Sequence, residues 1–463
     1  MSSPMRTLAP LAAALLLAGC SMMPTYERPA APVSAAFPYP SAAEGTPAPD
    51  LAWEQFFADA KLRSLIASAL RNNRDLRVAV LNIAQARAQY DIRQADRLPT
   101  VNAAVSGTRA PNNLGNQENL YTATLAFSSW ELDFFGRIAS LSEVALAQYL
   151  ATEEGRKAAQ VTLVASVASN WLALAADEEL LALTQQTLAT REESMRLMRL
   201  RLDQGVSSEI EFRVTQSLYE TARVTLAQVQ RQRALDLHAL ALLVGEPVPP
   251  EYQVGVTTDG VQLPDLPAGV PSDVLVRRPD VRQAEQQLVA ANANIGAARA
   301  NFFPRITLTA GVGTASRSLS DLFSGGSWGY SVAPSLLQPI FDAGRNRAGL
   351  ASAEVGRDIA VAQYERAIQQ AFRDVADALA GRATFGDQVE AQARVVEAEA
   401  VRLRLARLRF DNGVASYLDL LDAQRSLFTA QQGLVQSRLA RLQNQVQLYR
   451  ALGGGWTEAS ARP

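Results

Sequence analysis

The sequence predicts a mainly α-helical chain with a smaller β-sheet part, in which one series of helices and strands is encoded twice. Three observations carry this prediction. Short motifs recur at a fixed spacing, so that Gly136 and Gly344, like Gly205 and Gly413, are 208 residues apart. A helical pattern without proline runs from Arg137 to Gln204. Each copy also has two segments in which apolar and polar residues alternate, as they do in β-strands.

Composition excludes several classes of function. Of the 463 residues, 48% are hydrophobic, which is enough for a large buried core. The net charge of −2 gives no reason to expect a nucleic-acid partner. Cys20 and His238 are the only cysteine and histidine, so we expect no internal disulfide and no Cys/His metal site. Phosphate-binding glycine motifs and zinc-protease motifs are also absent from the sequence. We therefore expect no catalytic site and no enzyme.

The N-terminus has the features of an export signal. A short basic start precedes an apolar run from Leu8 to Ala18, which is too short to span a bilayer. The sequence Leu-Ala-Gly-Cys at 17–20 then resembles the bacterial lipobox, in which the cysteine is lipidated and becomes the first mature residue. This predicts a signal peptide at 1–19 and a covalent lipid on Cys20. We expect no other cofactor. Ser21 favours sorting to the outer membrane.

The recurring motifs divide the rest of the chain. Residues 20–50 are rich in proline, alanine and serine, which predicts an extended, lipidated tether rather than a packed element. The first repeat would span 51–245 and the second 273–456, joined by a linker at 246–272. A tail at 457–463 would follow.

Each repeat is expected to begin with a helix and continue with two strands. The helices would span Leu62 to Arg97 and Asp273 to Asn301, and a proline ends each of them. The strands are expected at 100–109, 120–135, 305–317 and 327–341. In the second copy, the apolar residues from Ile306 to Val312 would lie on one face and those from Trp328 to Leu336 on another.

A long helical hairpin would complete each repeat. The first would span 142–203 and return at 207–244, and the second would span 345–412 and return at 416–452. Polar residues interrupt the most apolar stretch, Val161 to Ala176, which therefore predicts a packed helix rather than a membrane span. The last helix has an apolar residue at every seventh position, as coiled coils do: Leu421, Phe428, Val435, Leu442 and Tyr449.

Four strands per chain imply an oligomer. Their length suits an outer membrane, which a strand of about 9 to 11 tilted residues crosses. An open sheet edge cannot lie in lipid, and the smallest membrane barrels have about eight strands. Eight strands enclose only side chains, whereas three chains would supply twelve strands and leave room for a channel.

Several motifs together carry a resemblance to a known family. FDNGV, YLDLLDAQRSLF and LYRALGGGW lie between Phe410 and Trp456, and RRPDVR and FDAGR lie at 277–282 and 341–345. From Cys20 onward the chain resembles the outer-membrane factors, the TolC-like exit ducts of tripartite efflux systems. It is most similar to their lipidated multidrug-efflux branch.

This resemblance implies a homotrimer with a twelve-stranded transmembrane β-barrel, which a long α-helical barrel of coiled-coil hairpins continues into the periplasm. It implies a passive duct that exports drugs or other small toxic compounds and is gated at its periplasmic tip. The implied partners are a periplasmic adaptor, an inner-membrane pump of the RND type and the lipid of the cell outer membrane. The pump supplies the energy, so this chain would catalyse nothing.

Asp419 and Asp422 are the candidate pore residues. They are three positions apart and therefore share one face of a helix, although solvated helix N-termini show the same pattern. The resemblance places them at the pore aperture, where each would form a ring of carboxylates that holds cations. It also assigns Leu418 to an apolar constriction. Arg409 and Glu211 are candidates for the latch, the polar contacts that close the tip.

The turns at Gly205 and Gly413 would face the adaptor.

Two other classes of protein remain as alternatives. A lipid-anchored periplasmic adaptor would have one hairpin rather than two, and a structural coiled-coil lipoprotein would not need alternating strands. A metal-ion duct of the same family is a third alternative, although the six methionines give no sign of a path for soft metals.

Overall fold

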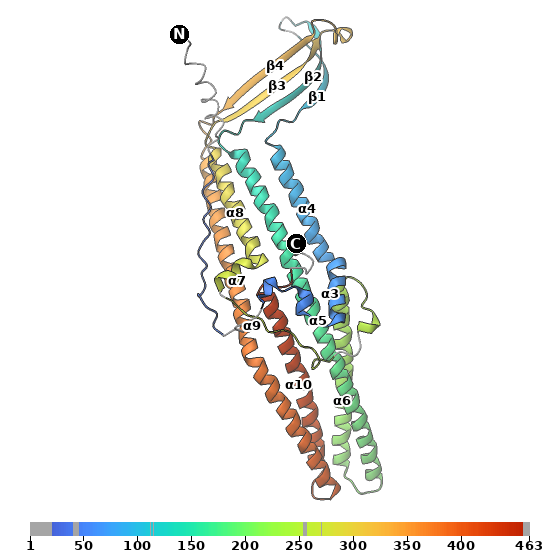
Figure 1. The fold of residues 1–463 in the computed structure, drawn as a ribbon. Helices are drawn as coiled ribbons and strands as arrows, with labels where there is room; N and C mark the ends of the chain where they lie inside the picture. Colours follow the sequence, from blue (N-terminus) through green and yellow to red (C-terminus); the bar gives the residue numbers. More distant parts are fainter. Residues whose placement is uncertain are drawn as a thin grey trace. The chain divides into compact units, whose positions relative to one another are not determined.

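A computed structural model describes residues 21–39, 46–111, 113, 115–252, 257–269 and 271–456. The expected signal peptide, Cys20 and the 457–463 tail lie outside these residues. Within them, long helices dominate and the strands form one four-stranded sheet (Figure 1).

The helices and strands follow the same order in the two halves of the chain. The first half contains η1 (Ala48–Asp50), α2 (Trp53–Phe56), α3 (Ala60–Asn72), α4 (Arg74–Ala95), β1 (Asn102–Pro111), β2 (Gln117–Glu131), α5 (Arg137–Asp203) and α6 (Glu209–Val244). The second half contains η2 (Pro250–Tyr252), α7 (Pro271–Arg277), α8 (Pro279–Ala300), β3 (Arg305–Ser316), η3 (Leu319–Asp321), β4 (Trp328–Leu337), α9 (Arg345–Asp411) and α10 (Tyr417–Ala451).

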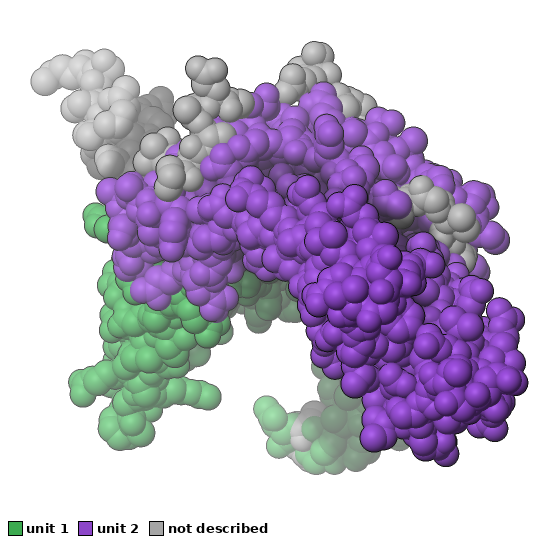
Figure 2. Space-filling model, turned by 90° about the horizontal axis from the view of Figure 1, so that it is seen from below, with its two compact units in different colours: residues 1–30, 81–153, 283–366 green, residues 31–80, 154–282, 367–463 purple. Residues whose placement is uncertain are grey.

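The chain divides into two compact units, and each unit draws on both halves of the sequence (Figure 2). The first unit contains residues up to 30, 81–153 and 283–366, and it holds the sheet. The second contains 31–80, 154–282 and the residues from 367 onward, and it holds the tips of both helical hairpins.

The expected first helix of each repeat is interrupted, contrary to the prediction. Asn73 separates α3 from α4, because its Oδ1 accepts from the Leu76 amide at 2.8 Å while its Nδ2 donates to the Leu243 carbonyl at 2.9 Å. Arg278 separates α7 from α8, because Pro279 disfavours helical geometry at the residue before it.

The four strands are antiparallel in the order β1-β2-β3-β4. Tyr330 lies opposite Val312, Val312 lies opposite Leu125, and Ala123 on the same face lies opposite Val105. Residues directly opposite each other point to the same side of a sheet. The apolar residues of β3 and β4 therefore share one face, which corrects the prediction of two faces, and this apolar face continues across β2 and β1.

The other face of the sheet is small and polar. Ser106 and Thr122 are hydrogen-bonded across it at 2.7 Å. Its further members are Thr124, Thr307, Thr309, Gly311, Gly313, Ser331 and Ser335. Both outer strands are edges, since neither β1 nor β4 pairs with a further strand within the described residues.

Residues 21–30 are extended but held in place, which corrects the prediction of an unpacked tether. Arg28 donates to both carboxylate oxygens of Glu285 on α8, at 2.6 and 2.9 Å. The Tyr26 hydroxyl lies 3.2 Å from the same carboxylate. The Asn292 side chain donates to the Pro24 carbonyl at 2.9 Å. These contacts fix the segment along α8 within the first unit.

The core of the second unit is built on helix α5 and aromatic rings. Tyr449 stacks on Phe56 with a centroid separation of 4.1 Å, and its hydroxyl donates to the Leu51 carbonyl at 2.7 Å. Among the described helices, α5 alone is long and apolar enough to cross a membrane, but Trp171 and Leu172 are buried in this core. The five heptad residues of α10 are buried, as predicted.

Candidate functional site

Both helical hairpins end in the same kind of turn. Gly205 and Gly413 have φ values of +71° and +70°, in the left-handed region that glycine adopts without strain. The Val414 amide donates to the Arg409 carbonyl at 2.8 Å and closes the end of α9, as glycine-containing helix ends commonly do. The tips therefore have nearly the same backbone, which the sequence repeat predicts.

A capping box starts the second helix of each hairpin. Ser208 and Glu211 exchange hydrogen bonds at 3.0 and 3.2 Å, and Ser416 and Asp419 do so at 3.1 and 3.2 Å. The Ser207 hydroxyl also donates to Glu211 at 2.7 Å, and these bonds hold the pKa of Glu211 below its usual value. Asp419 thus has a local role in the helix end as well as an exposed carboxylate.

Asp422 differs from Asp419 because two guanidinium groups bind it. Arg402 of α9 and Arg425 of α10 each donate to one of its oxygens. Arg402 also donates to Glu399 at 3.1 Å and to the Ser426 hydroxyl at 3.2 Å. The hydrogen bond from Arg402 lowers the pKa of Asp422, so this carboxylate stays ionised but its charge is largely neutralised.

Exposed apolar side chains surround both turns at equivalent positions of the repeat. Val206 and Ile210 are 64% and 70% exposed on the first tip. Val414 and Leu418 are 68% and 43% exposed on the second. Apolar side chains that gather on an exposed surface are typical of a surface that meets another molecule.

The two tips share one small core. Its buried members come from α5, α6 and α10: Met198, Phe212, Tyr417, Leu420 and Leu421. Phe410 packs against this cluster, with its ring 5.1 Å from that of Tyr417. The core fixes the first turns of α6 and α10, and therefore the directions in which Glu211, Asp419 and Asp422 point.

The structure brings some of the predicted site residues together and leaves others apart. Asp419 and Asp422 lie in the first two turns of α10, next to Leu418. No ion pair joins Arg409 to Glu211 in the described part of the chain. Sequence reasoning missed Arg402 and Arg425. The spacing of three residues from Asp422 could have identified Arg425, whereas Arg402 is found only once α9 is paired with α10.

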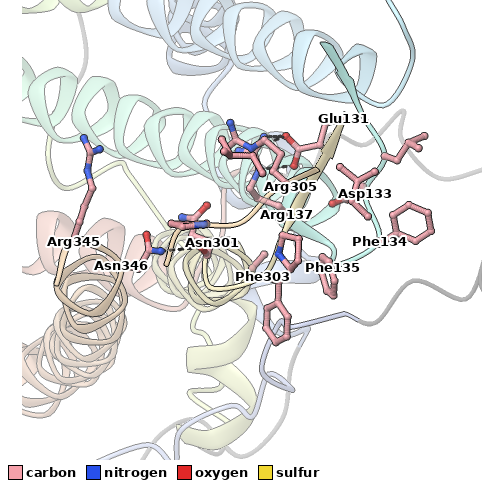
Figure 3. Close-up of a pocket in the computed structure, with 16 residues that line it drawn as sticks. Glu131, Asp133, Phe134, Phe135, Arg137, Asn301, Phe303, Arg305, Arg345 and Asn346 are labelled. Carbon is pink, nitrogen blue, oxygen red and sulfur yellow. Dashed lines mark hydrogen bonds and ion pairs between the residues drawn. The ribbon is translucent and has the colours of Figure 1, made fainter. Parts of the chain in front are cut away.

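A pocket of about 290 Å³ in the first unit is a second candidate site (Figure 3). Glu131 at the end of β2 accepts from Arg137 at 2.6 and 2.8 Å, and Arg305 lies 3.3 Å away. Phe135 stacks on Phe303 at 4.7 Å. Because these charged groups already satisfy one another, the cluster serves to join β2 and β3 to α5.

Comparison with known proteins gives matches along nearly the whole chain. The family model described as "Outer membrane efflux protein" matches residues 65–246 and 270–454. The probable efflux pump outer membrane protein TtgC of Pseudomonas putida is 46% identical, over 97% of this chain and 95% of its own length. The outer membrane protein OprJ of Pseudomonas aeruginosa is 44% identical, over 99% and 98%.

Solved structures agree with these sequence matches. The open state of the MtrE outer membrane channel of Neisseria gonorrhoeae has a TM-score of 0.89 and 40% identity, and the match covers 96% of this chain and 100% of MtrE. A structure of CusC has a TM-score of 0.86 and 40% identity, with coverage of 94% and 100%.

Proposed function

Because the chain belongs to the outer membrane efflux protein family and acts as an exit duct in the outer membrane, we propose that it works as a homotrimer between a periplasmic adaptor and the exterior. The similar channel structures confirm the predicted TolC-like fold. They do not support the alternatives of an adaptor or a coiled coil without a pore. The family is one of transport ducts, and in our proposal an inner-membrane pump of the RND type supplies the energy.

The apolar face of the sheet is the observation that carries the trimer proposal. Val105 on β1 and Tyr330 on β4 are 80% and 85% exposed on this face, so the single chain leaves it uncovered. Lipid would cover an apolar face, but it cannot satisfy the backbone groups of two open edges. Pairing β4 of one copy with β1 of the next removes all edges, and three copies give twelve strands, which leave room for a channel where the eight strands of two copies would not.

Native mass spectrometry of the detergent-extracted protein tests the oligomeric state. We expect a species that contains three chains and withstands dilution, because each contact continues a sheet and buries apolar surface. A stable monomer or dimer that still restores export in a strain lacking this protein would contradict the trimer.

We further propose that Leu418, Asp419 and Asp422 line the aperture at the periplasmic tip. Since Asp422 is already bound by two arginines, Asp419 would present most of the negative charge to the passage. Arg409 is exposed and could reach a neighbouring hairpin. For Glu211 to act as the other latch residue, it would have to exchange its bonds with Ser207 and Ser208 for contacts across the tip.

The adaptor would dock on the two turns at Gly205 and Gly413. Support comes from the exposed apolar side chains that flank each turn, because water-exposed valine, isoleucine and leucine favour burial against a partner. Both tips offer equivalent side chains, so a trimer would present six similar docking points to an adaptor.

The cargo we propose is a small toxic organic compound. Support comes from similar proteins of Pseudomonas putida, which are described as outer membrane proteins of toluene, solvent and antibiotic efflux pumps. A metal-ion duct of the same family remains the alternative. The pump selects the cargo in either case, so exchange of the pump, with this duct kept, should change the exported compounds.

Cys20 would carry the lipid anchor, and its replacement by serine tests this proposal. We expect wild-type protein to incorporate radioactive palmitate and the Cys20→Ser protein to lose the label, because serine offers no thiol to which the lipid can be attached. Residues 21–30 lie along α8, so the lipid would attach close to the first unit. A wild-type protein that takes up no fatty acid would refute the anchor.

A further inference from the structure

Arg191 of α5 is a buried cation without a counter-charge. Only 4% of the Arg191 surface is exposed. Its Nη1 donates to the Leu218 carbonyl of α6 at 2.8 Å, and its guanidinium lies over the Phe428 ring of α10, 5.2 Å from the centroid. No carboxylate pairs with it among the residues that the structure describes. The neighbouring Glu192 and Glu193 are exposed, on a different side of the helix.

Arg278 shows how this chain otherwise buries a guanidinium. Its side chain is 9% exposed, and it binds Asp280 at 2.6 Å and Asp374 at 3.3 Å. In the second repeat, the position equivalent to Arg191 is Glu399, which pairs with Arg402. An unpaired buried charge strongly destabilises a protein, so the Arg191 guanidinium is expected to have a partner of opposite charge. Burial accordingly lowers the pKa of Arg191.

A cavity of about 190 Å³ lies beside Arg191, between α5 of the first hairpin and α9 and α10 of the second. Its polar lining is neutral apart from the guanidinium and includes Thr187, Thr190, Gln424 and Gln431. Gln424 Oε1 is buried and has no hydrogen-bond partner. A buried amide oxygen of this kind needs a hydrogen-bond donor, which a bound water can supply.

We propose that this cavity binds a small inorganic anion of the size of chloride, together with water. A guanidinium has five N–H donors, and Leu218 occupies only one of those on Arg191. The anion accepts from donors that remain, and a water bound to it donates to Gln424 Oε1. One water takes up about 30 Å³ of liquid, so the cavity has room for an anion and a few waters.

The anion site is separate from the candidate aperture. Successive residues of an α-helix are about 100° apart, so Gln424 lies on the side of α10 opposite Asp422. The walls of the site come from both hairpins. A bound anion therefore favours the arrangement in which α5 lies against α10, because a ligand stabilises the state that binds it.

Thermal unfolding of the full-length protein in detergent tests the site. Sodium chloride replaces the sodium salt of a bulky organic sulfonate at constant ionic strength, which removes general salt effects. We expect a saturable rise of the unfolding midpoint in the wild type and no rise in Arg191→Gln. Arg196→Gln is the matched control, since Arg196 is on the same helix with a side chain that is 73% exposed. This control should respond as the wild type does.

Bromide gives a second readout that does not depend on the variant. Crystals of the wild type soaked in sodium bromide should show an anomalous peak near the Arg191 guanidinium. We expect a separation of at most about 4 Å, because a halide that accepts a charged hydrogen bond lies within that distance. A chloride response that is absent, or equal in Arg191→Gln, would overturn the proposal. An acidic side chain of a neighbouring subunit in the cavity would also overturn it.

Discussion

Arginine in place of Val332 is expected to prevent insertion into the outer membrane. Val332 is on the apolar face of β4, where it is 62% exposed and lies opposite Ala310. An arginine on the lipid face of a barrel costs about 2–4 kcal/mol near the middle of the bilayer. A trimer would carry this cost three times. One such cost alone corresponds to a change of about tenfold or more in an equilibrium. We therefore expect the amount of trimer in outer-membrane fractions to fall at least about tenfold, and export to fail with it.

The adjacent Ser331→Arg is the matched control. It introduces the same side chain one position earlier, on the small and polar face opposite Gly311. Substitutions on the lumen side of a barrel change conduction more than insertion. We therefore expect near-normal amounts of trimer with altered conductance. If Ser331→Arg failed to insert while Val332→Arg inserted normally, the assignment of the two faces would be reversed.

The sequence repeat predicted most of the helices and strands, because their signals are local. Glycine turns, proline stops and alternation each act within a few residues. The break at Asn73 is different, since its side chain donates to Leu243, 170 positions later in the chain. The break before Pro279 did have a local signal, because the residue that precedes a proline avoids helical geometry.

The shared apolar face could not be predicted from single strands. Alternation says which residues of one strand lie together, but only the register says which faces of two strands coincide. The pairing of Tyr330 with Val312 supplies this register. Composition likewise predicted an extended segment after Cys20, but the bond between Arg28 and Glu285 depends on a helix far away in the sequence.

The same limit applies to the hairpin tip. The aspartates of α10 were predicted from spacing and resemblance, and α10 places them in its first two turns. Their unequal environments were not predicted, because Arg402 reaches Asp422 from the other helix of the hairpin. A prediction from sequence alone treats Asp419 and Asp422 as equal charges, whereas the structure distinguishes them.

Asparagine substitutions test this distinction. Asp419→Asn removes a carboxylate that is engaged only in the helix cap, and asparagine keeps an oxygen for the Ser416 amide. Asp422→Asn removes a charge that Arg402 and Arg425 already neutralise. It also leaves these two arginines near the passage without their partner. We therefore expect Asp419→Asn to weaken block by a multivalent cation roughly tenfold, since a trimer loses three exposed charges at one level.

Single-channel recordings with a multivalent cation on the periplasmic side would measure both variants. Asp422→Asn should also weaken the block, through the repulsion of the freed arginines. Arg402→Ala should strengthen it, because it removes one positive charge and leaves Asp422 with Arg425 as its remaining partner. This opposite sign is the sharpest consequence of the observed ion pairs. Glu390→Gln removes an exposed carboxylate of α9 that is farther from the tip, and it should leave the block unchanged. Equal block in Asp419→Asn and the wild type would remove Asp419 from the aperture, because an exposed ring of charge in a narrow passage must act on a passing cation.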